Sequence, residues 1–226
     1  MSDISLDGVF AALAAQPRKS AGDGRALMFI SARRKEGVTA AAVAAANAAG
    51  PGAVYAIDLD LQRNTLARAL SEDGAPLGPK IDGALEGQSF CNAVDANKRL
   101  LRGVQPFSFH RKGRSRLFVG AFDPRVMPQG ARVHIASTSV YWDAARAGGA
   151  TVIVDAPALE RSQIALRVAR HMDGVVLVIG ADAGAAPAAL HAKAQLLEAG
   201  ANLMGLVYTG ATAPVMAIER LMRQAG

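Results

Sequence analysis

Short, strongly apolar runs alternate with longer helical runs along most of this chain, and the alternation limits the folds it can adopt. Some runs, such as Thr151–Val154, are apolar almost throughout, as parallel strands covered on both faces are. An alternation of strands and helices predicts an α/β fold with a mostly parallel, twisted sheet flanked by helices. The runs that predict strands are Ala26–Ser31, Ala53–Asp58, Arg116–Phe122, Thr151–Val154, Gly174–Ile179 and Asn202–Tyr208.

Helical patterns follow most of these runs. Gly50 and Pro51 close the first of them, and Ser137 or Thr138 is placed to cap another. The predicted helices are Val38–Ala49, Asn64–Leu70, Ser137–Ala147, Ser162–His171, Ala185–Ala199 and Pro214–Arg223.

Two parts of the chain lie outside the regular alternation. Residues 1–25 predict a short helix, Val9–Ala15, followed by a polar linker, and residues 26–226 predict a single domain. Within that domain, residues 71–115 hold several Gly and Pro residues. We interpret them as a surface excursion between strands and not as a second domain.

Composition narrows the class of protein further. The 226 residues are 51% hydrophobic and 19% charged, which suits one substantial core and excludes a disordered chain. A single cysteine, Cys91, excludes an intrachain disulfide and a cysteine-based zinc site, and the four histidines show no ligand spacing. The beginning of the chain lacks the pattern of a signal peptide, and no apolar run is long enough to span a bilayer, so we expect a cytoplasmic location.

The net charge of +6 is compatible with an acidic binding partner. Aromatic residues make up only 5%, which argues against a stacking platform for single-stranded nucleic acid. Much of the excess positive charge falls in one segment. This segment is either a surface that binds an acidic partner, an anionic membrane or DNA, or a charged surface loop without a partner. The segment is Lys98–Arg116, with Lys98, Arg99, Arg102, His110, Arg111, Lys112, Arg114 and Arg116.

The residues that follow the predicted strands carry the chemistry, because ligands of open α/β sheets bind at the C-terminal ends of the strands. After the first strand comes SARRKEGVT, residues 31–39. A P-loop has the pattern G-x-x-x-x-G-K-[ST] at this place, and Gly37 and Thr39 match it, whereas Val38 occupies the Lys position. Asp60 and Asp155 follow two other strands, where an acid facing a P-loop holds Mg²⁺ and its waters.

Together these motifs resemble the MinD/ParA-type P-loop ATPases, and more closely the cytoplasmic ATPase domain of bacterial tyrosine autokinases of capsule and exopolysaccharide synthesis. In that family the loop typically reads S-x-x-P-G-E-G-K-[ST], and the later motifs read D-x-D-x-R and D-x-P-P. Here the corresponding segments are SARRKEGVT, DLDLQR at residues 58–63 and DAPA at residues 155–158. Residues 205–209, GLVYT, resemble the family strand G-V-V-L-N. The resemblance covers about residues 26–211 and implies a three-layer P-loop NTPase-like sandwich.

The resemblance also implies ATP and Mg²⁺ as ligands and assigns a role to each matching residue. Asp60 and Asp155 take the catalytic positions, and Thr39, Asp60 and Asp155 take the metal positions. Thr209 stands where the family has the Asn that recognises adenine. The nucleotide-binding positions are Ser31, Arg33, Arg34, Lys35, Glu36, Gly37, Val38, Thr39 and Thr209.

The departures from the family pattern predict impaired chemistry. Val38 offers no charge to a triphosphate, and Arg34 and Lys35 replace the flexible Pro-Gly of the loop. Arg33 falls where MinD/ParA members carry a second Lys. The Tyr-rich tail of the kinase members and their E-x-x-R-x-x-R oligomerisation motif have no counterpart in this sequence.

Simpler interpretations of the same residues stay open. Asp60 and Asp155 are either metal and water ligands or solvated acids at strand ends. Thr39 is either a Mg²⁺ ligand or the cap of its helix. The run Arg33–Lys35 is either an anion site at a helix N-terminus or a solvated basic loop.

Three functions follow from these alternatives. The first is a degenerate P-loop protein, regulatory or scaffolding, that docks on a membrane chain-length or export protein of polysaccharide synthesis and is peripheral at the inner membrane. The second is an active ATPase or tyrosine autokinase in which Arg33, Arg34 or Lys35 substitutes for the missing Lys. The third is a ParA/MinD-like positioning protein that binds DNA or membrane. Self-association is a further expectation, although the dimer that MinD/ParA-like proteins form across the nucleotide depends on features that this sequence lacks.

Overall fold

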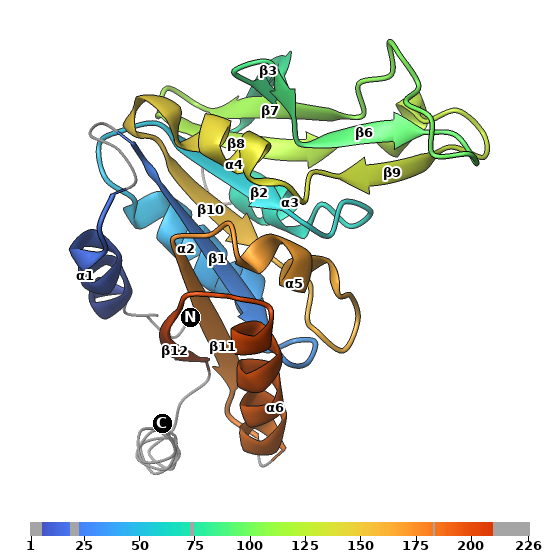
Figure 1. Cartoon of the computed structure of the whole chain (residues 1–226). Helices are drawn as coiled ribbons and strands as arrows, with labels where there is room; N and C mark the ends of the chain where they lie inside the picture. The colour runs from blue at the N-terminus through green and yellow to red at the C-terminus, as the bar shows by residue number, and fades with distance from the viewer. Residues whose placement is uncertain (1–5, 19–22, 73–74, 183, 210–226) are drawn as a thin grey trace.

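The computed structural model describes residues 6–18, 23–72, 75–182 and 184–209. Within these residues a central sheet of eight strands lies between two layers of helices (Figure 1). The strand order is β12-β11-β1-β10-β2-β8-β7-β3, and the first six strands in this order are parallel. The predicted three-layer α/β fold with a mostly parallel sheet is therefore confirmed.

The six parallel strands are those that the apolar runs predict, with ends that differ by a residue or two. β1 is fully buried and pairs with β10 on one side and β11 on the other. The register sets Asp58 beside Asp155 at the C-terminal ends of β2 and β10. The bounds are β1 Arg25–Ser31, β2 Val54–Asp58, β8 Leu117–Phe122, β10 Thr151–Asp155, β11 Gly174–Gly180 and β12 Leu203–Thr209.

Helices cover both faces because side chains alternate along each strand. Leu27 and Phe29 of β1 belong to one apolar core, with α1, α2 and α3, and Met28 and Ile30 belong to the other, with α4, α5 and α6. The predicted helix Pro214–Arg223 lies outside the described residues. The bounds are α1 Asp7–Ala15, α2 Val38–Ala48, α3 Thr65–Glu72, α4 Ser139–Arg146, α5 Ile164–Ala169 and α6 Ala185–Glu198, with short 3₁₀ turns η1 Pro124–Val126 and η2 Ala147–Gly149.

The interpretation of residues 71–115 as a surface excursion is wrong. Strands β7, Phe107–Lys112, and β3, Leu77–Asp82, extend the main sheet in antiparallel fashion beyond β8. Phe107 and Phe109 of β7 are buried, so a two-residue alternation packs this segment onto the core. The segment also contributes the small strands β4 Ala84–Leu85, β5 Gln88–Ser89 and β6 Cys91–Val94, and β6 pairs with β9 Arg132–Ile135 in a separate ribbon.

These strands divide the basic segment that the sequence predicts as one cluster. Residues 98–102 lie in the loop before β7, whereas Arg111, Arg114 and Arg116 lie at or after its end. Residues 103–110, which include the first four residues of β7, separate the two groups. The basic residues of Lys98–Arg116 therefore lie on two parts of the fold, and binding of an acidic partner or an anionic membrane by this segment stays a prediction.

At the β3 edge of the sheet the pairing is irregular. The register between β3 and β7 shifts between Leu77 and Lys80, and Pro79, which has no N–H group, lies in this interval. Elsewhere in the described chain, no helix combines the length and apolar character that crossing a bilayer requires.

Candidate functional site

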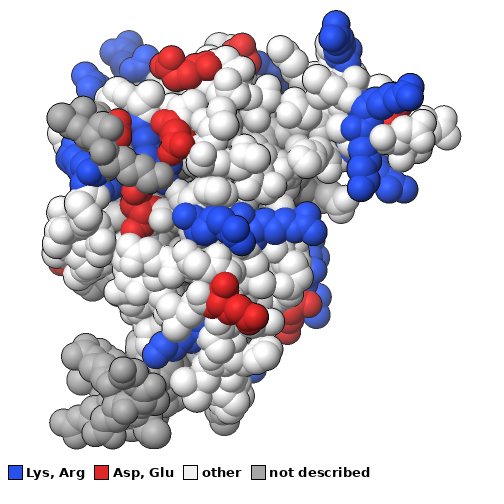
Figure 2. All heavy atoms as spheres, in the orientation of Figure 1, with Lys and Arg blue, Asp and Glu red and all other residues white. Residues whose placement is uncertain are grey.

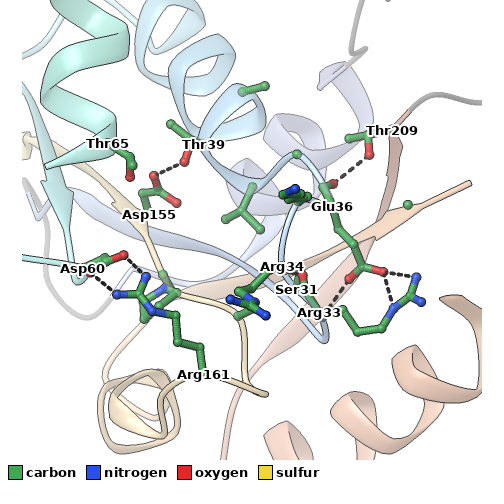
Figure 3. Close-up of a pocket in the computed structure, with 18 of the residues that line it drawn as sticks. Ser31, Arg33, Arg34, Glu36, Thr39, Asp60, Thr65, Asp155, Arg161 and Thr209 are labelled. Carbon is green, nitrogen blue, oxygen red and sulfur yellow. Dashed lines mark hydrogen bonds and ion pairs between the residues drawn. The ribbon is translucent and has the colours of Figure 1, made fainter. Parts of the chain in front are cut away.

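A cavity of about 1200 Å³ opens at the C-terminal ends of the parallel strands. The loop after β1 forms one wall, and the ends of β2, β10, β11 and β12 contribute the rest. Every residue that the sequence places in the site lines this cavity (Figure 3). The motifs therefore meet in one place, as the topology of a parallel sheet requires.

The loop enters α2 through Gly37, which has a φ of +87°. A Cβ atom added at Gly37 would lie 2.7 Å from Cγ2 of Thr209, so this position requires glycine. The Thr209 hydroxyl in turn donates to the backbone carbonyl of Glu36 over 2.7 Å. Thr209 thus holds the loop against β12, and its hydroxyl is engaged by the backbone.

Val38 opens α2 and is only 9% exposed. It belongs to the same apolar core as Leu27 and Phe29. The position that carries the phosphate-binding Lys in a P-loop therefore presents an uncharged side chain that contributes to packing.

Two backbone amides of the loop are already hydrogen-bonded to carboxylates of the chain itself. The N–H of Arg33 donates to Oε2 of Glu36 over 3.0 Å, and the N–H of Arg34 donates to Oε1 of Glu160 over 2.7 Å. In a P-loop, backbone amides of this kind cradle the phosphates. Here the carboxylates take the place of phosphate oxygens at these two donors.

The guanidinium groups of the loop are paired with the same carboxylates. Arg33 Nη2 lies 3.0 Å from Glu36 Oε1 and 2.6 Å from Asp182 Oδ2, and Arg34 Nε lies 3.2 Å from Glu160 Oε1. The hydrogen bond from Arg33 lowers the pKa of Asp182, and the hydrogen bonds from Arg34, led by its backbone N–H, lower the pKa of Glu160. The arginines of the loop are therefore paired with internal carboxylates, although the Arg34 side chain is 65% exposed and that of Arg33 is 30% exposed.

Lys35 differs from its neighbours. Its side chain is exposed, and no carboxylate of the described chain lies within ion-pair distance of it. Its backbone has a φ of +65°, in the left-handed region that favours the glycine of the family pattern. Among the described residues, Lys35 is thus the cation of this loop that has no ion-pair partner.

On the opposite side of the cavity, the hydroxyl of Thr39 donates to Oδ2 of Asp155 over 2.7 Å. Gly37, not Thr39, is the N-cap of α2, and no side chain caps this helix, so the interpretation of Thr39 as a helix cap is wrong. Asp155 is 3% exposed, and burial, followed by the neighbouring charge of Asp58, raises its pKa well above the ordinary range. Asp155 is therefore a buried acid and not a solvated one.

Asp58 organises the turn between β2 and α3. Its carboxylate accepts hydrogen bonds from the N–H of Asp60 at 2.7 Å, the hydroxyl of Thr65 at 3.0 Å and the N–H of Leu66 at 3.1 Å. Burial nevertheless raises the pKa of Asp58. Asp58 and Asp155 thus form a buried acidic pair at the ends of adjacent strands.

Asp60 is held by Arg161 in a two-pronged ion pair (Figure 3). Arg161 Nη2 lies 3.0 Å from Oδ1 of Asp60, and the second guanidinium nitrogen contacts Oδ2. Asp60 is therefore neither a free ligand nor simply solvated. Across the described ranges, no group of three or more His, Cys, Asp or Glu side chains is placed to hold a metal ion.

Sequence reasoning missed several residues of the site. Glu160 and Arg161 belong to the loop after β10, and Asp182 follows β11. Their charges are visible in the sequence, but no spacing rule indicates which loop residue each of them binds. Asp58 lies inside the recognised DLDLQR segment, and its burial at the end of β2 is the signal that could have marked it.

The sequence matches no protein-family model, and no curated protein is significantly similar to it. Among solved structures, the chimerical protein CapA2B2 is similar with a TM-score of 0.51 and 16% identity, over 90% of this chain and 80% of that one. The kinase domain of Escherichia coli tyrosine kinase ETK is similar with a TM-score of 0.48 and 18% identity, over 87% of this chain and 72% of that one. A ParA family ATPase from Chlorobium tepidum TLS is similar with a TM-score of 0.43 and 16% identity, over 89% of this chain and 81% of that one.

At these identities the likeness is one of fold, and the similarity to CapA2B2 carries it. The chain therefore shares a three-layer α/β fold with the chimerical protein CapA2B2.

Proposed function

We propose that this chain is a degenerate P-loop protein that binds ATP weakly or not at all and acts as a regulatory or scaffolding component of exopolysaccharide or capsule synthesis and export. One observation carries the proposal. The loop amides of Arg33 and Arg34 donate to the carboxylates of Glu36 and Glu160, while the Lys position holds the buried Val38.

The residues present do not fit a triphosphate in this arrangement. An entering phosphate would have to displace two carboxylates from the loop amides or lie beside their negative charge. A P-loop Lys offsets such a cost, and Val38 cannot. Arg33 and Arg34 would each have to exchange an existing ion pair for a new one, so they bring little additional attraction.

A second candidate, an unusual but active ATPase, is favoured by two observations. Thr39 and Asp155 keep the hydroxyl–carboxylate contact that the metal side of the site needs, and Lys35 is an exposed cation in the loop. If nucleotide and Mg²⁺ bind, Thr39 and Asp155 would hold the metal, and Lys35 would contact phosphate. The metal would supply charge neutralisation to the phosphates.

The biological setting rests on the motif resemblance. In the autokinase family, the cytoplasmic tail of a membrane partner activates the ATPase, and a degenerate member can keep the docking while losing the chemistry. The proposed partner is accordingly a membrane chain-length or export protein, and the proposed location is peripheral at the inner membrane. Self-association is part of the proposal only in a form that does not require nucleotide.

Calorimetric titration of the full chain with ATP and Mg²⁺ tests the loss of nucleotide binding. We expect no saturable heat at submillimolar ATP, and binding in the micromolar range would overturn the proposal. The variant Val38→Lys alone should gain little, because Glu160 still occupies the loop. Adding Glu160→Ala should raise the affinity about tenfold or more, whereas the matched surface variant Val38→Lys/Glu198→Ala should not.

Complementation separates the scaffold from the enzyme. In a strain that lacks this gene, we expect a Thr39→Val variant to restore polysaccharide export as well as the unaltered chain does. An ATPase would lose its metal-side hydroxyl in that variant and fail. Protein levels measured in the same cells exclude a simple loss of the variant.

A further inference from the structure

The ribbon of β6 and β9 is extended by a third segment. After the turn at residues 95–98 the chain runs back beside β6, and Leu100 bridges to Val94 while the N–H of Leu101 donates to the carbonyl of Ala93. Val94 is also paired with Arg132 of β9. Directly paired residues share a face of a sheet, so Leu100 and Arg132 project on the same side.

The two faces of this ribbon differ. Ala93 is fully buried and its partner Val133 is half-buried, so one face packs on the protein. The other face presents Leu100 and Arg132, both exposed. The ribbon therefore has an inner apolar face and an outer face on which Leu100 and Arg132 are exposed.

The end of the ribbon is strongly basic. No carboxylate of the residues described here lies within ion-pair distance of its exposed cations. The two acids nearest in sequence are engaged elsewhere: Asp95 accepts from the backbone N–H groups of its own turn, and Asp123 binds Lys80 and Arg125. Figure 2 shows Lys and Arg side chains gathered at the end of the molecule where the ribbon lies. These cations are Lys98, Arg99, Arg102 and Arg132.

Leu100 stands among these charges and is 58% exposed, more than any other large apolar side chain of the described residues. Exposed single leucines are common and need no explanation on their own. Here, however, the side chain lies within two residues of three cations on a projecting turn. This combination matches the requirements of an anionic lipid surface, where cations meet headgroup phosphates and an apolar side chain enters the boundary below them.

We propose that the ribbon tip, defined as Lys98, Arg99, Leu100, Arg102 and Arg132, docks on anionic lipid headgroups. The cations contact phosphate, and Leu100 enters the interface between headgroups and acyl chains. Duplex DNA would satisfy the cations equally well but offers Leu100 no apolar environment, and the tip has no aromatic side chain on which bases could stack. The proposal deepens the peripheral membrane location of the proposed function, but it uses no residue of the cavity, so its failure would leave the proposed loss of nucleotide binding untouched.

Flotation of the full chain with vesicles tests this surface without nucleotide. We expect binding to vesicles of phosphatidylcholine mixed with phosphatidylglycerol, little binding to phosphatidylcholine alone, and weakening by salt. Arg102→Gln should lower the affinity about fivefold, since a cation near an anionic surface contributes about 1 kcal/mol. Leu100→Ser should lower it by roughly tenfold through the lost apolar burial.

Matched controls come from the other end of β7 and from α6. Arg114→Gln removes an exposed cation of the second basic group, and Leu190→Ser removes a side chain that is 47% exposed on α6. Both should bind vesicles as the unaltered chain does, and circular dichroism confirms that all four variants fold. Equal loss in the controls, equal binding to neutral vesicles, or tighter binding to duplex DNA with the same dependence on Arg102 would overturn the proposal.

Discussion

The two sides of the cavity differ in the surroundings of their carboxyl groups. On the loop side, Glu160 and Asp182 are paired with guanidinium groups, which lowers the pKa of both carboxyls. On the strand-end side, Asp58 and Asp155 are buried beside each other, which raises the pKa of both. One side thus holds its anions with internal cations, while the other side carries acids that lack such a partner.

This difference is the one on which the proposed function depends. Thr39 contacts Asp155 on the strand-end side, whereas on the loop side two backbone amides donate to carboxylates and Val38 occupies the Lys position of the P-loop pattern. On the loop side, Arg33 and Arg34 already have carboxylate partners, and Lys35 is the loop cation without one among the described residues. The strand-end side still favours added positive charge, whether a proton or a metal cation.

The largest expected effect is on the strand-end side. Asp58→Ala leaves the buried N–H of Leu66 and the hydroxyl of Thr65 without their acceptor. We expect the free energy of unfolding to fall by about 3 kcal/mol, measured by denaturant titration. Asp58→Asn keeps an acceptor oxygen and serves as the control, and an equal loss in both variants would contradict the role of these hydrogen bonds.

Next in size is a dependence of stability on pH. The pKa of Asp155 is raised in the folded protein above the ordinary value of 3.8. Between these two pKa values the unfolded chain has released the proton but the folded protein still holds it. The free energy of unfolding therefore falls as the pH rises through this range. Asp155→Asn removes that loss while keeping an acceptor for Thr39. We expect the variant to be more stable than the unaltered chain at pH 8 but not at pH 4, with a difference that grows by on the order of 1 kcal/mol for each pH unit between the two pKa values.

A smaller change in the free energy of unfolding is expected at Arg161, which forms an ion pair with Asp60. The Arg161 side chain is 30% exposed and Asp60 is 13% exposed, so the ion pair is partly screened. Arg161→Ala should lower the free energy of unfolding by about 1 kcal/mol. Arg63→Ala is the matched control, because Arg63 lies 3.9 Å from the same carboxylate and should change stability less.

The smallest effect tests the loop side at its exposed rim. The carboxylate of Asp182 pairs with Arg33 but is 62% exposed, so water and salt screen the interaction. We expect Asp182→Asn to leave the melting temperature unchanged within error. A clear drop would show that the loop side depends on this pair as strongly as the strand-end side depends on Asp58.

Sequence reasoning reached the parallel part of the fold because its strands carry continuous apolar runs, such as those of β10 and β11. It missed β3 because this strand is largely exposed and contains Gly78 and Pro79, and it missed the ribbon because β6 and β9 have only four residues each. Sequence reasoning placed the site residues in one cavity because ligands of open α/β sheets bind at the C-terminal ends of the strands. It could not predict that Arg33 binds Asp182, because the partners are 149 residues apart and the choice depends on loop geometry.

The irregular edge at β3 has a consequence for assembly. Proline at position 79 offers no N–H to an incoming strand, and the shifted register around it breaks the even spacing of donors that another strand would need. The antiparallel extension therefore ends the sheet at an edge where pairing with a further strand is disfavoured.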